Sequence, residues 1–227
     1  MPVGELPPFD DWENLDISIG QQGLPHWQLA GATYAIVFRL ADSLSAVIKE
    51  KLRDEKILLM GRNARGEDVA DELSALSSRL QSILDQGLGS CLLRQSQNAE
   101  IVVGALRHFD GERYSLGAWC VMPNHVHVIV RPRPGHSLGE ILHTWKSFTA
   151  HRIQKVTGGS GDFWQKDAYN RIIRDEQEWE HQSADVARNP IEAGLVDWKW
   201  FGHGSLGQER HALATVPESS STHPRPS

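Results

Sequence analysis

Residues 119–130 read Trp119-Cys120-Val121-Met122-Pro123-Asn124-His125-Val126-His127-Val128-Ile129-Val130, and this stretch decides the fold. Two runs rich in β-branched and aromatic residues, 113–121 and 125–130, flank its centre, Met122-Pro123-Asn124. Proline and asparagine are typical of tight turns, whereas β-branched and aromatic side chains favour strands. The stretch therefore predicts an antiparallel β-hairpin.

The rest of the chain adds strand and helix patterns on both sides of this β-hairpin. In order, we expect a strand at 34–40, helices at about 44–57, 70–86 and 99–109, the β-hairpin, a helix from Ser137, an extended piece at 163–173, and a helix from about Asp175 to Arg188 that stops at Asn189-Pro190. This order predicts an α+β fold, a ferredoxin-like (RRM-like) antiparallel sheet packed with helices. The region at about 60–110 is expected to be an additional helical insertion.

The composition changes at two points and suggests three regions. Residues 1–24 are rich in Pro, Gly and acidic side chains, and we expect a flexible acidic leader there. Residues 25–200 hold the periodic patterns and are the expected folded domain. Residues 201–227 are rich in Ser, His and Pro, which predicts a disordered tail.

The whole composition excludes several classes of protein. The 227 residues are 40% hydrophobic and 23% charged, as in ordinary globular proteins. No run approaches the roughly 18 apolar residues of a membrane span. The first residues lack the pattern of a secretory signal, and two cysteines, Cys91 and Cys120, do not make a disulfide framework. The expected compartment is the cytoplasm, with no membrane partner.

The net charge of −6 at first argues against a nucleic-acid partner, because phosphate binding depends on Lys and Arg. However, residues 1–24 contain five acidic side chains and no Lys or Arg. Residues 131–174, in contrast, have a net charge of +5. This local charge restores nucleic acid as a candidate partner.

His125 and His127 are the most distinctive side chains of the predicted β-hairpin. Residues at i and i+2 of a strand project from the same face, so both imidazoles are expected to point the same way. Two such imidazoles can chelate one divalent ion. An isolated His-x-His is more often plain polar surface, so the pair needs support from its context.

That context is a series of motifs spread over most of the predicted domain. Besides 119–130, the motifs are Phe38-Arg39-Leu40-Ala41-Asp42-Ser43, Ser137-Leu138, Trp145-Lys146-Ser147-Phe148-Thr149, Phe163-Trp164-Gln165, Arg171-Ile172-Ile173-Arg174-Asp175-Glu176 and Asn189-Pro190-Ile191-Glu192-Ala193-Gly194-Leu195-Val196. In order and spacing, the sequence from about Pro25 to Trp200 closely resembles the REP-associated tyrosine transposases. These proteins are relatives of the single-tyrosine HUH transposases, which move DNA as single strands.

The resemblance implies a metal-assisted DNA nickase. In that family the imidazoles, here His125 and His127, hold Mg²⁺ or Mn²⁺ at the scissile phosphate, and a polar side chain, here Asn189, completes the metal shell. A tyrosine attacks the phosphorus and forms a 5′-phosphotyrosine. The implied partner is single-stranded or hairpin DNA, and the expected phosphate contacts are Arg131, Arg133, Lys146, Arg152, Arg171 and Arg174. The sequence is compatible with a monomer or a homodimer.

The chain departs from the family at the nucleophile. The family tyrosine lies four residues before the Asn of Asn-Pro, and this chain has Asp185 there. Asp185 is a possible metal ligand but a poor replacement for a phenol. Tyr169 is the alternative nucleophile, although an aromatic side chain packed on the sheet is the favoured explanation for it.

Three functions therefore compete. The chain is a DNA nickase and strand transferase, or a domesticated relative that binds DNA hairpins without nicking them. The third possibility is a metal-dependent phosphodiesterase that uses an activated water with Asp185 beside the ion. The missing tyrosine separates the first function from the other two.

Overall fold

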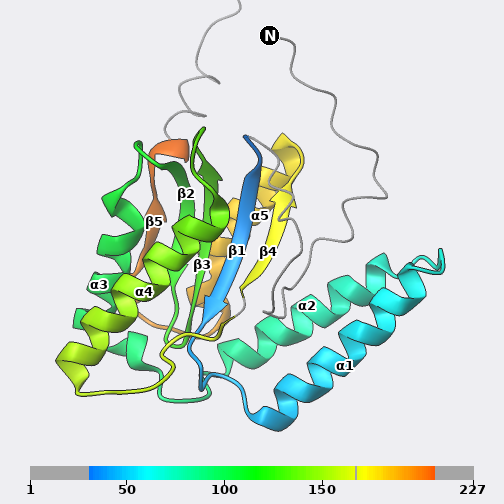
Figure 1. Ribbon diagram of the computed structural model, residues 1–227, viewed down its shortest axis with the longest axis horizontal. Helices are drawn as coiled ribbons and strands as arrows, with labels where there is room; N and C mark the ends of the chain where they lie inside the picture. Colours follow the sequence, from blue (N-terminus) through cyan, green and yellow to red (C-terminus); the bar gives the residue numbers. More distant parts are fainter. Residues whose placement is uncertain (1–30, 167, 208–227) are drawn as a thin grey trace, which may run out of the picture.

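A computed structural model describes residues 31–166 and 168–207 (Figure 1). Along the chain the elements are β1 (Thr33–Arg39), α1 (Ala46–Asn63), α2 (Ala70–Asp85), the 3-10 turn η2 (Leu92–Arg94), α3 (Ser96–His108), β2 (Tyr114–Val121), β3 (His125–Pro132), α4 (Leu138–Thr157), β4 (Tyr169–Ile173), α5 (Glu176–Glu192) and β5 (Phe201–His203). The predicted leader, 1–24, lies outside the described residues.

The five strands form one antiparallel sheet in the order β4-β1-β3-β2-β5. The first four have the order of the ferredoxin-like βαββαβ unit, with β1 and β3 in the centre. The predicted β-hairpin is β2–β3, and Val121 pairs with Val126 next to its turn. The α+β fold class predicted from the sequence is confirmed.

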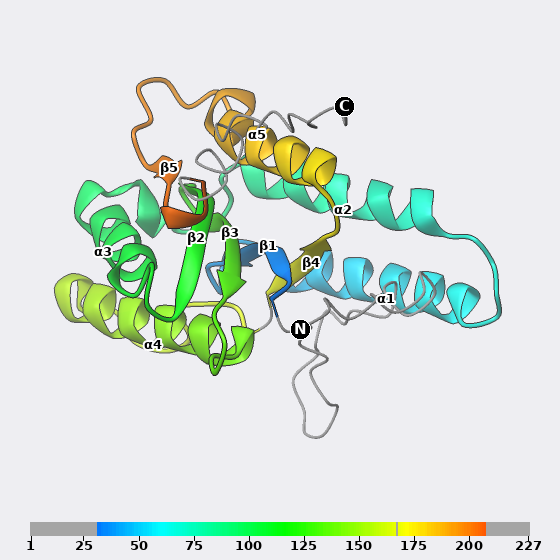
Figure 2. The ribbon, with the colours of Figure 1, turned by 90° about the horizontal axis from the view of Figure 1, so that it is seen from above.

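Helices cover both faces of the sheet (Figure 2). On one face, α3 and α4 pack on Val126, Val128 and Val130, with Trp145 of α4 fully buried among them. On the other face, α5 packs Trp179 on the sheet, in a cluster with Ile129 and Cys120. Because side chains alternate along β3, His125 and His127 share the face of Ile129 and point toward α5.

Helices α1 and α2, residues 46–85, form an antiparallel pair that extends away from the sheet, and we call it the helical arm (Figure 1). Its apolar contacts form a small separate core of Leu59, Val69 and Leu76. The sequence placed the insertion at about 60–110, and the structure corrects these bounds. Helix α3 belongs to the sheet, because Val102 and Leu106 are buried in the main core.

Helix α4 begins where the sequence predicts. The Ser137 hydroxyl accepts a hydrogen bond from the Glu140 amide, and the Glu140 carboxylate accepts one from the Ser137 amide, both at 3.1 Å. This capping box satisfies two amides of the first turn that would otherwise lack partners. Gly158, with φ 70°, ends the helix.

The structure corrects two predictions near the C-terminus. Helix α5 does not stop at Asn189-Pro190 but continues to Glu192. Proline costs the helix one amide hydrogen bond, but its ring is buried, and the Ala193 amide still donates to the Asn189 carbonyl at 3.0 Å beyond it. The structure therefore presents Asn189 on a helix face.

The second correction concerns the predicted tail, 201–227. Strand β5 (Phe201–His203) extends the sheet beside β2, and Leu206 is fully buried. Gly202 is needed there, because a Cβ would lie 2.9 Å from the Trp119 ring. Residues 208–227 lie outside the described residues.

Candidate metal and nucleic-acid site

The turn before β3 is held by backbone hydrogen bonds from three directions. The Met122 amide donates to the His125 carbonyl at 2.8 Å, the Leu40 amide to the Asn124 carbonyl at 2.8 Å, and the Leu93 amide to the Pro123 carbonyl at 3.1 Å. These bonds connect the turn to the end of β1 and to η2. The position of His125, directly after the turn, is therefore set by the fold itself.

The two imidazoles meet through their Nε2 atoms, which lie 2.9 Å apart. The Asn124 amide nitrogen donates to the Leu88 carbonyl at 2.9 Å, so its side-chain oxygen is left to accept from His125 Nδ1 at 2.7 Å. This assigns the proton of His125 to Nδ1 and leaves Nε2 with a lone pair. A second partner that orients the imidazole in this way is typical of metal-binding histidines.

Burial keeps both imidazoles neutral. His125 is completely buried and His127 is 7% exposed. Loss of solvent lowers the pKa of His127 from 6.5 to about 4. Burial also lowers the pKa of His125 well below its usual value, and positive charge on His127 or Arg39 adds to this effect. Near neutral pH both side chains are unprotonated, as metal binding requires.

Three side chains from two helices complete the cluster. Gln81 of α2 places its amide nitrogen 3.2 Å from His127 Nε2, 3.5 Å from His125 Nε2 and 3.1 Å from the Asn189 side-chain oxygen. The same nitrogen lies 3.0 and 3.1 Å from the carboxylate oxygens of Asp85, one helical turn further along α2. Of these three, the sequence predicted only Asn189.

Asp85 is a carboxyl group in an unfavourable place for charge. Burial, followed by the negative charge of Glu192, raises its pKa from 3.8 to about 6, although the hydrogen bond from Gln81 opposes this rise. One of its oxygens lies 3.8 Å from His125 Nε2. Because this imidazole is neutral, no positive charge balances the Asp85 carboxylate there.

The donor atoms fit a small divalent cation. An octahedral ion with bonds of about 2.1 Å has neighbouring ligand atoms about 3.0 Å apart, close to the 2.9 Å between the imidazole nitrogens. In the described part of the chain, no three or more His, Cys, Asp or Glu side chains are arranged to hold a metal ion. The structure brings together the three side chains that the sequence named: both imidazole Nε2 atoms and the Asn189 oxygen lie within 3.1–3.5 Å of the Gln81 amide nitrogen. Their role as metal ligands stays a prediction.

The two candidate nucleophiles occupy different positions. Asp185 is on α5, 39% exposed, and pairs with Arg188 at 2.5 Å and His181 at 3.3 Å. Tyr169 begins β4 and pairs with Val37, which on its other side pairs with His127. Directly paired residues share a face of the sheet. Tyr169 and His127 therefore lie in one transverse row, two strand spacings or about 10 Å apart.

A large groove of about 1230 Å³ joins these side chains. His127, Asn189, Tyr169 and Asp185 all line it, between α2, β4 and α5. Its charged lining residues are four acidic side chains, Asp85, Glu178, Asp185 and Glu192, and three basic ones, Lys56, Arg171 and Arg174. The groove is thus not basic by itself.

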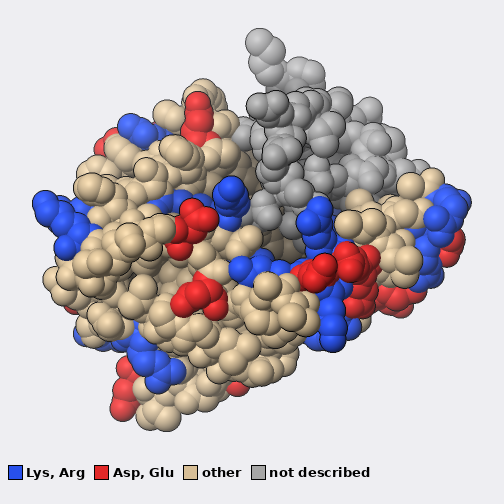
Figure 3. Space-filling view, turned by 60° about the horizontal axis from the view of Figure 1, so that its bottom comes forward, with Lys and Arg blue, Asp and Glu red and all other residues tan. Residues whose placement is uncertain are grey.

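The predicted phosphate contacts do not form one surface. Arg171 and Arg174 line the groove, where both pair with Glu178 at 2.7 and 3.2 Å. Lys146, on the opposite face of the sheet, donates to the Gln165 and Lys166 carbonyls and ties down a loop. Arg152 is also on α4, and Arg131 and Arg133 lie at the far end of β3. Figure 3 shows basic and acidic side chains interspersed on one face.

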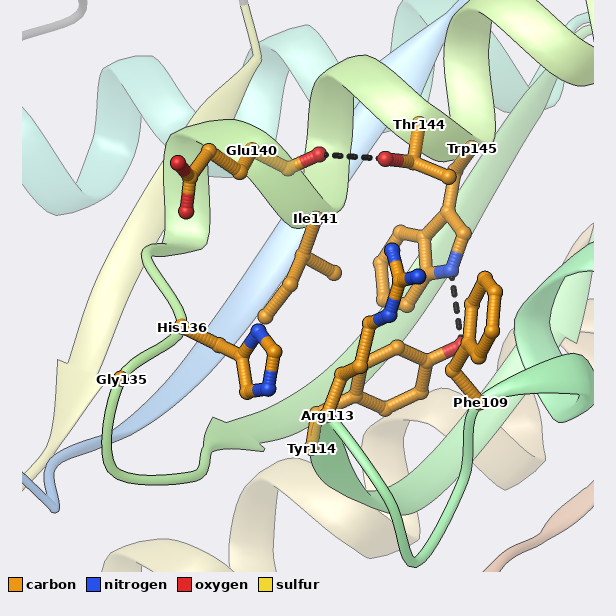
Figure 4. Close-up of a pocket in the computed structure, with 9 residues that line it drawn as sticks. All are labelled: Phe109, Arg113, Tyr114, Gly135, His136, Glu140, Ile141, Thr144 and Trp145. Carbon is orange, nitrogen blue, oxygen red and sulfur yellow. Dashed lines mark hydrogen bonds between the residues drawn. The ribbon is translucent and has the colours of Figure 1, made fainter.

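A smaller hollow of about 310 Å³ lies at the other end of the sheet, beside the start of α4 (Figure 4). The Trp145 indole donates to the Tyr114 hydroxyl at 3.0 Å, and the Arg113 guanidinium lies 3.6 Å from the centre of the Phe109 ring. Tyr114 pairs with Pro132, the last residue of β3, whereas His125 is the first. These contacts pack α4 on the sheet, and the hollow is separate from the groove.

Two solved structures are similar to the chain. One is a REP-associated tyrosine transposase bound to a REP hairpin, 14% identical, with 91% of this chain and 100% of that chain covered and a TM-score of 0.44. The other is a putative transposase from Deinococcus radiodurans R1, 13% identical, with 75% and 97% covered and a TM-score of 0.30. No curated protein matches the chain.

A family model matches part of the chain, residues 99–178. The matched part contains β2, β3 and α4, with both imidazoles, and ends before Asp185 and Asn189. The resemblance predicted from the motifs around His125 and His127 is confirmed at this level: residues 99–178 match the family described as IS200-like transposases.

Proposed function

We propose that this chain is a transposase-like protein that binds single-stranded or hairpin DNA and holds Mg²⁺ or Mn²⁺ with His125, His127 and Asn189. The observation that carries the proposal is the pair of buried, neutral imidazoles with Nε2 atoms 2.9 Å apart, of which His127 lines an open groove. The family match over the same strand supports DNA as the partner.

The bound cation would polarise a phosphate of the DNA as a Lewis acid. The protein contributes the geometry. Asn124 holds the His125 ring through Nδ1, so that Nε2 would point at the ion, and the buried first six residues of β3 keep both imidazoles in place. Low pKa values keep both rings available as ligands down to mildly acidic pH.

The charge of the groove supports metal-dependent DNA binding. Four acidic side chains and three basic ones line the groove, so a DNA phosphate would meet little net attraction there. A divalent ion at the imidazoles reverses this balance and provides a direct contact for the phosphate. The proposal therefore expects the metal to be needed for DNA binding as well as for chemistry.

The first experiment measures binding of a fluorescent DNA hairpin by the full chain, with Mn²⁺ or with EDTA. We expect Mn²⁺ to tighten binding at least tenfold, and affinity to fall steeply as salt rises, because phosphate contacts release counterions. His127→Ala should remove the effect of Mn²⁺. Equal affinity with and without metal, or equal affinity for a duplex of the same length, would contradict the proposal.

The second experiment asks whether a covalent adduct forms. Asp185 is tied to His181 and Arg188 and is not a phenol, so we propose that the natural chain forms no stable DNA adduct. A denaturing gel of labelled DNA after incubation with Mn²⁺ should show no protein-linked band. Asp185→Tyr is expected to create one, because position 185 lies one helical turn before Asn189, and Asp185→Phe is the matched control.

Tyr169 is the basis of a second candidate function, an active nickase. Its place in the transverse row of His127 favours it. In that reaction the Tyr169 hydroxyl gives up its proton, its oxygen bonds to phosphorus, the bond from phosphorus to the 3′ oxygen breaks, and that oxygen takes a proton. An adduct made by the natural chain and lost in Tyr169→Phe would establish this function. Nicked DNA without an adduct would instead indicate water as the nucleophile.

A further inference from the structure

The side-chain nitrogen of Gln81 has more close polar neighbours than it can hydrogen-bond to. Its side-chain nitrogen lies within 3.0–3.5 Å of five oxygen and nitrogen atoms: both Asp85 oxygens, the Asn189 oxygen and the two imidazole Nε2 atoms. An amide nitrogen carries two protons and can donate two good hydrogen bonds. The two imidazole Nε2 atoms also lie 2.9 Å from each other. Five possible ligand atoms therefore converge on the point that the amide nitrogen occupies, which is the arrangement expected around a cation.

Gln81 and Asp85 belong to the same face of α2. They are one turn apart, and Leu84 between them is 1% exposed, so this face is turned into the protein. Both are on the helical arm, which is outside the sequence matched to the transposase family. Neither residue was singled out by the sequence.

The end of α2 is fixed to the strand that carries the imidazoles. The Asn124 side chain, which orients His125, also donates to the Leu88 carbonyl at 2.9 Å. Beyond it, the Ser90 amide donates to the Asp42 carboxylate at 2.7 Å. Gly89, with φ +85°, approaches Asp42 so closely that a Cβ would lie 2.6 Å from its carbonyl oxygen. The arm is therefore held at its base, where Gln81 and Asp85 meet the sheet.

We propose that Asp85 and Gln81 of the helical arm complete one divalent-cation site with His125, His127 and Asn189. The inference rests on the metal site of the proposed function and adds two ligands to it. In the structure, the Gln81 amide nitrogen occupies the position between these side chains that a cation would take. As the side chains lie, His125, His127 and Asp85 are not yet arranged as a ligand group, and an Asp85 oxygen is 3.8 Å from His125 Nε2. To hold an ion, the Gln81 amide would turn its oxygen inward, and the Asp85 carboxylate would be the only charged ligand.

This ligand set has a chemical consequence. A site of two imidazoles and one amide oxygen is neutral and weak for a hard ion, whereas a carboxylate adds charge and the oxygen donor that Mg²⁺ and Mn²⁺ prefer. The arm thus supplies most of the electrostatic attraction, and the strand supplies the fixed geometry. Metal affinity should depend on α2 as strongly as on β3.

The test is a calorimetric titration of the full chain with Mn²⁺. We expect one bound ion in the natural protein and a loss of affinity of at least tenfold in Asp85→Asn. Gln81→Glu should tighten binding several-fold, because it replaces a neutral ligand by a charged one. Damage to the fold cannot produce such a gain. Asp71→Asn removes the same charge from the first turn of α2 and is the matched control, expected to bind within twofold of the natural chain.

The outcomes separate this inference from the proposed function. If His127→Ala abolishes Mn²⁺ binding while Asp85→Asn and Gln81→Glu bind like the natural chain, the two new ligands are refuted and the imidazole site stands. If the natural chain binds no Mn²⁺, the proposed metal site fails as well. If Asp85→Asn weakens binding and Gln81→Glu strengthens it, the inference holds whether or not DNA is bound.

Discussion

The sheet with α3, α4 and α5, which we call the sheet body, and the helical arm bury their apolar side chains in different ways. The sheet body has continuous cores on both faces, with Trp145 and Tyr114 fully buried. The arm has a small core around Leu59 and Leu76 and leaves Leu58 of α1 66% exposed. The sheet body is therefore the rigid part of the molecule. The helical arm is fixed to it mainly at its base, where the candidate metal site lies.

The largest expected difference between the two regions is in stability. Trp145→Ala removes a side chain that is packed between Phe38 and Tyr114, and it should lower the free energy of unfolding by about 3–5 kcal/mol. Leu76→Ala should cost about 2 kcal/mol and act on the arm alone. Urea unfolding and hydrogen exchange measure both effects. Faster exchange in the sheet of Leu76→Ala would show that arm and body form one cooperative unit.

The next effect is on the pH dependence of stability in EDTA. The pKa of His127 is about 4 in the folded chain and 6.5 when unfolded, so its contribution is present above pH 6.5 and is lost as pH falls toward 4. Asp85 acts in the opposite direction. Its pKa is about 6 folded and 3.8 unfolded, so its contribution is present below pH 3.8 and is lost as pH rises through 6.

Between pH 4 and 6 the imidazoles of the body and the carboxyl of the arm therefore oppose each other. Asp85→Asn removes the opposing group, and the loss of stability on acidification should become steeper by about 1 kcal/mol per pH unit. Asp71→Asn should leave the slope as it is. A slope that is unchanged in Asp85→Asn would mean that Asp85 is not coupled to folding.

The smallest expected effect compares the helix caps of the two regions. Ser137→Ala breaks the capping box of α4 and should cost about 1 kcal/mol of global stability. Ser45→Ala removes a single 3.3 Å bond to the Ile48 amide at the start of α1, and it should cost about 0.5 kcal/mol. Thermal unfolding of the two variants gives the ranking, and equal losses would argue against a weaker attachment of the arm.

The sequence predicted most helices and strands of both regions, and two of its errors lie near the C-terminal end of the sheet body. Strand residues such as Val126 and Val128 signal their own conformation, and the spacing of His125 and His127 places both rings on one face. The prediction ended helix α5 too early because proline is in general a helix breaker, whereas Pro190 lies inside the helix with its ring buried. Strand β5 was missed because three residues carry little pattern of their own and depend on pairing with β2.

The sequence predicted only part of the candidate site. Asn189 followed from a motif, whereas Gln81 and Asp85 come from a distant part of the chain. The only signal for them was two polar residues four apart beside Leu84. The same pattern is typical of the solvent-exposed edge of a helix. Packing of α2 on the sheet decides between the two, and this contact is not encoded in a local pattern.

The central claim is that β3, α2 and α5 together hold one divalent cation. The most direct test is a crystal structure of the full chain grown with Mn²⁺ and measured for anomalous scattering. We expect one strong anomalous peak about 2.1 Å from the Nε2 atoms of His125 and His127, with Asp85 and Asn189 oxygens bound to the same ion. Crystals saturated with Mn²⁺ that show no peak there, with the Gln81 nitrogen still between the imidazoles and Asp85, would contradict it.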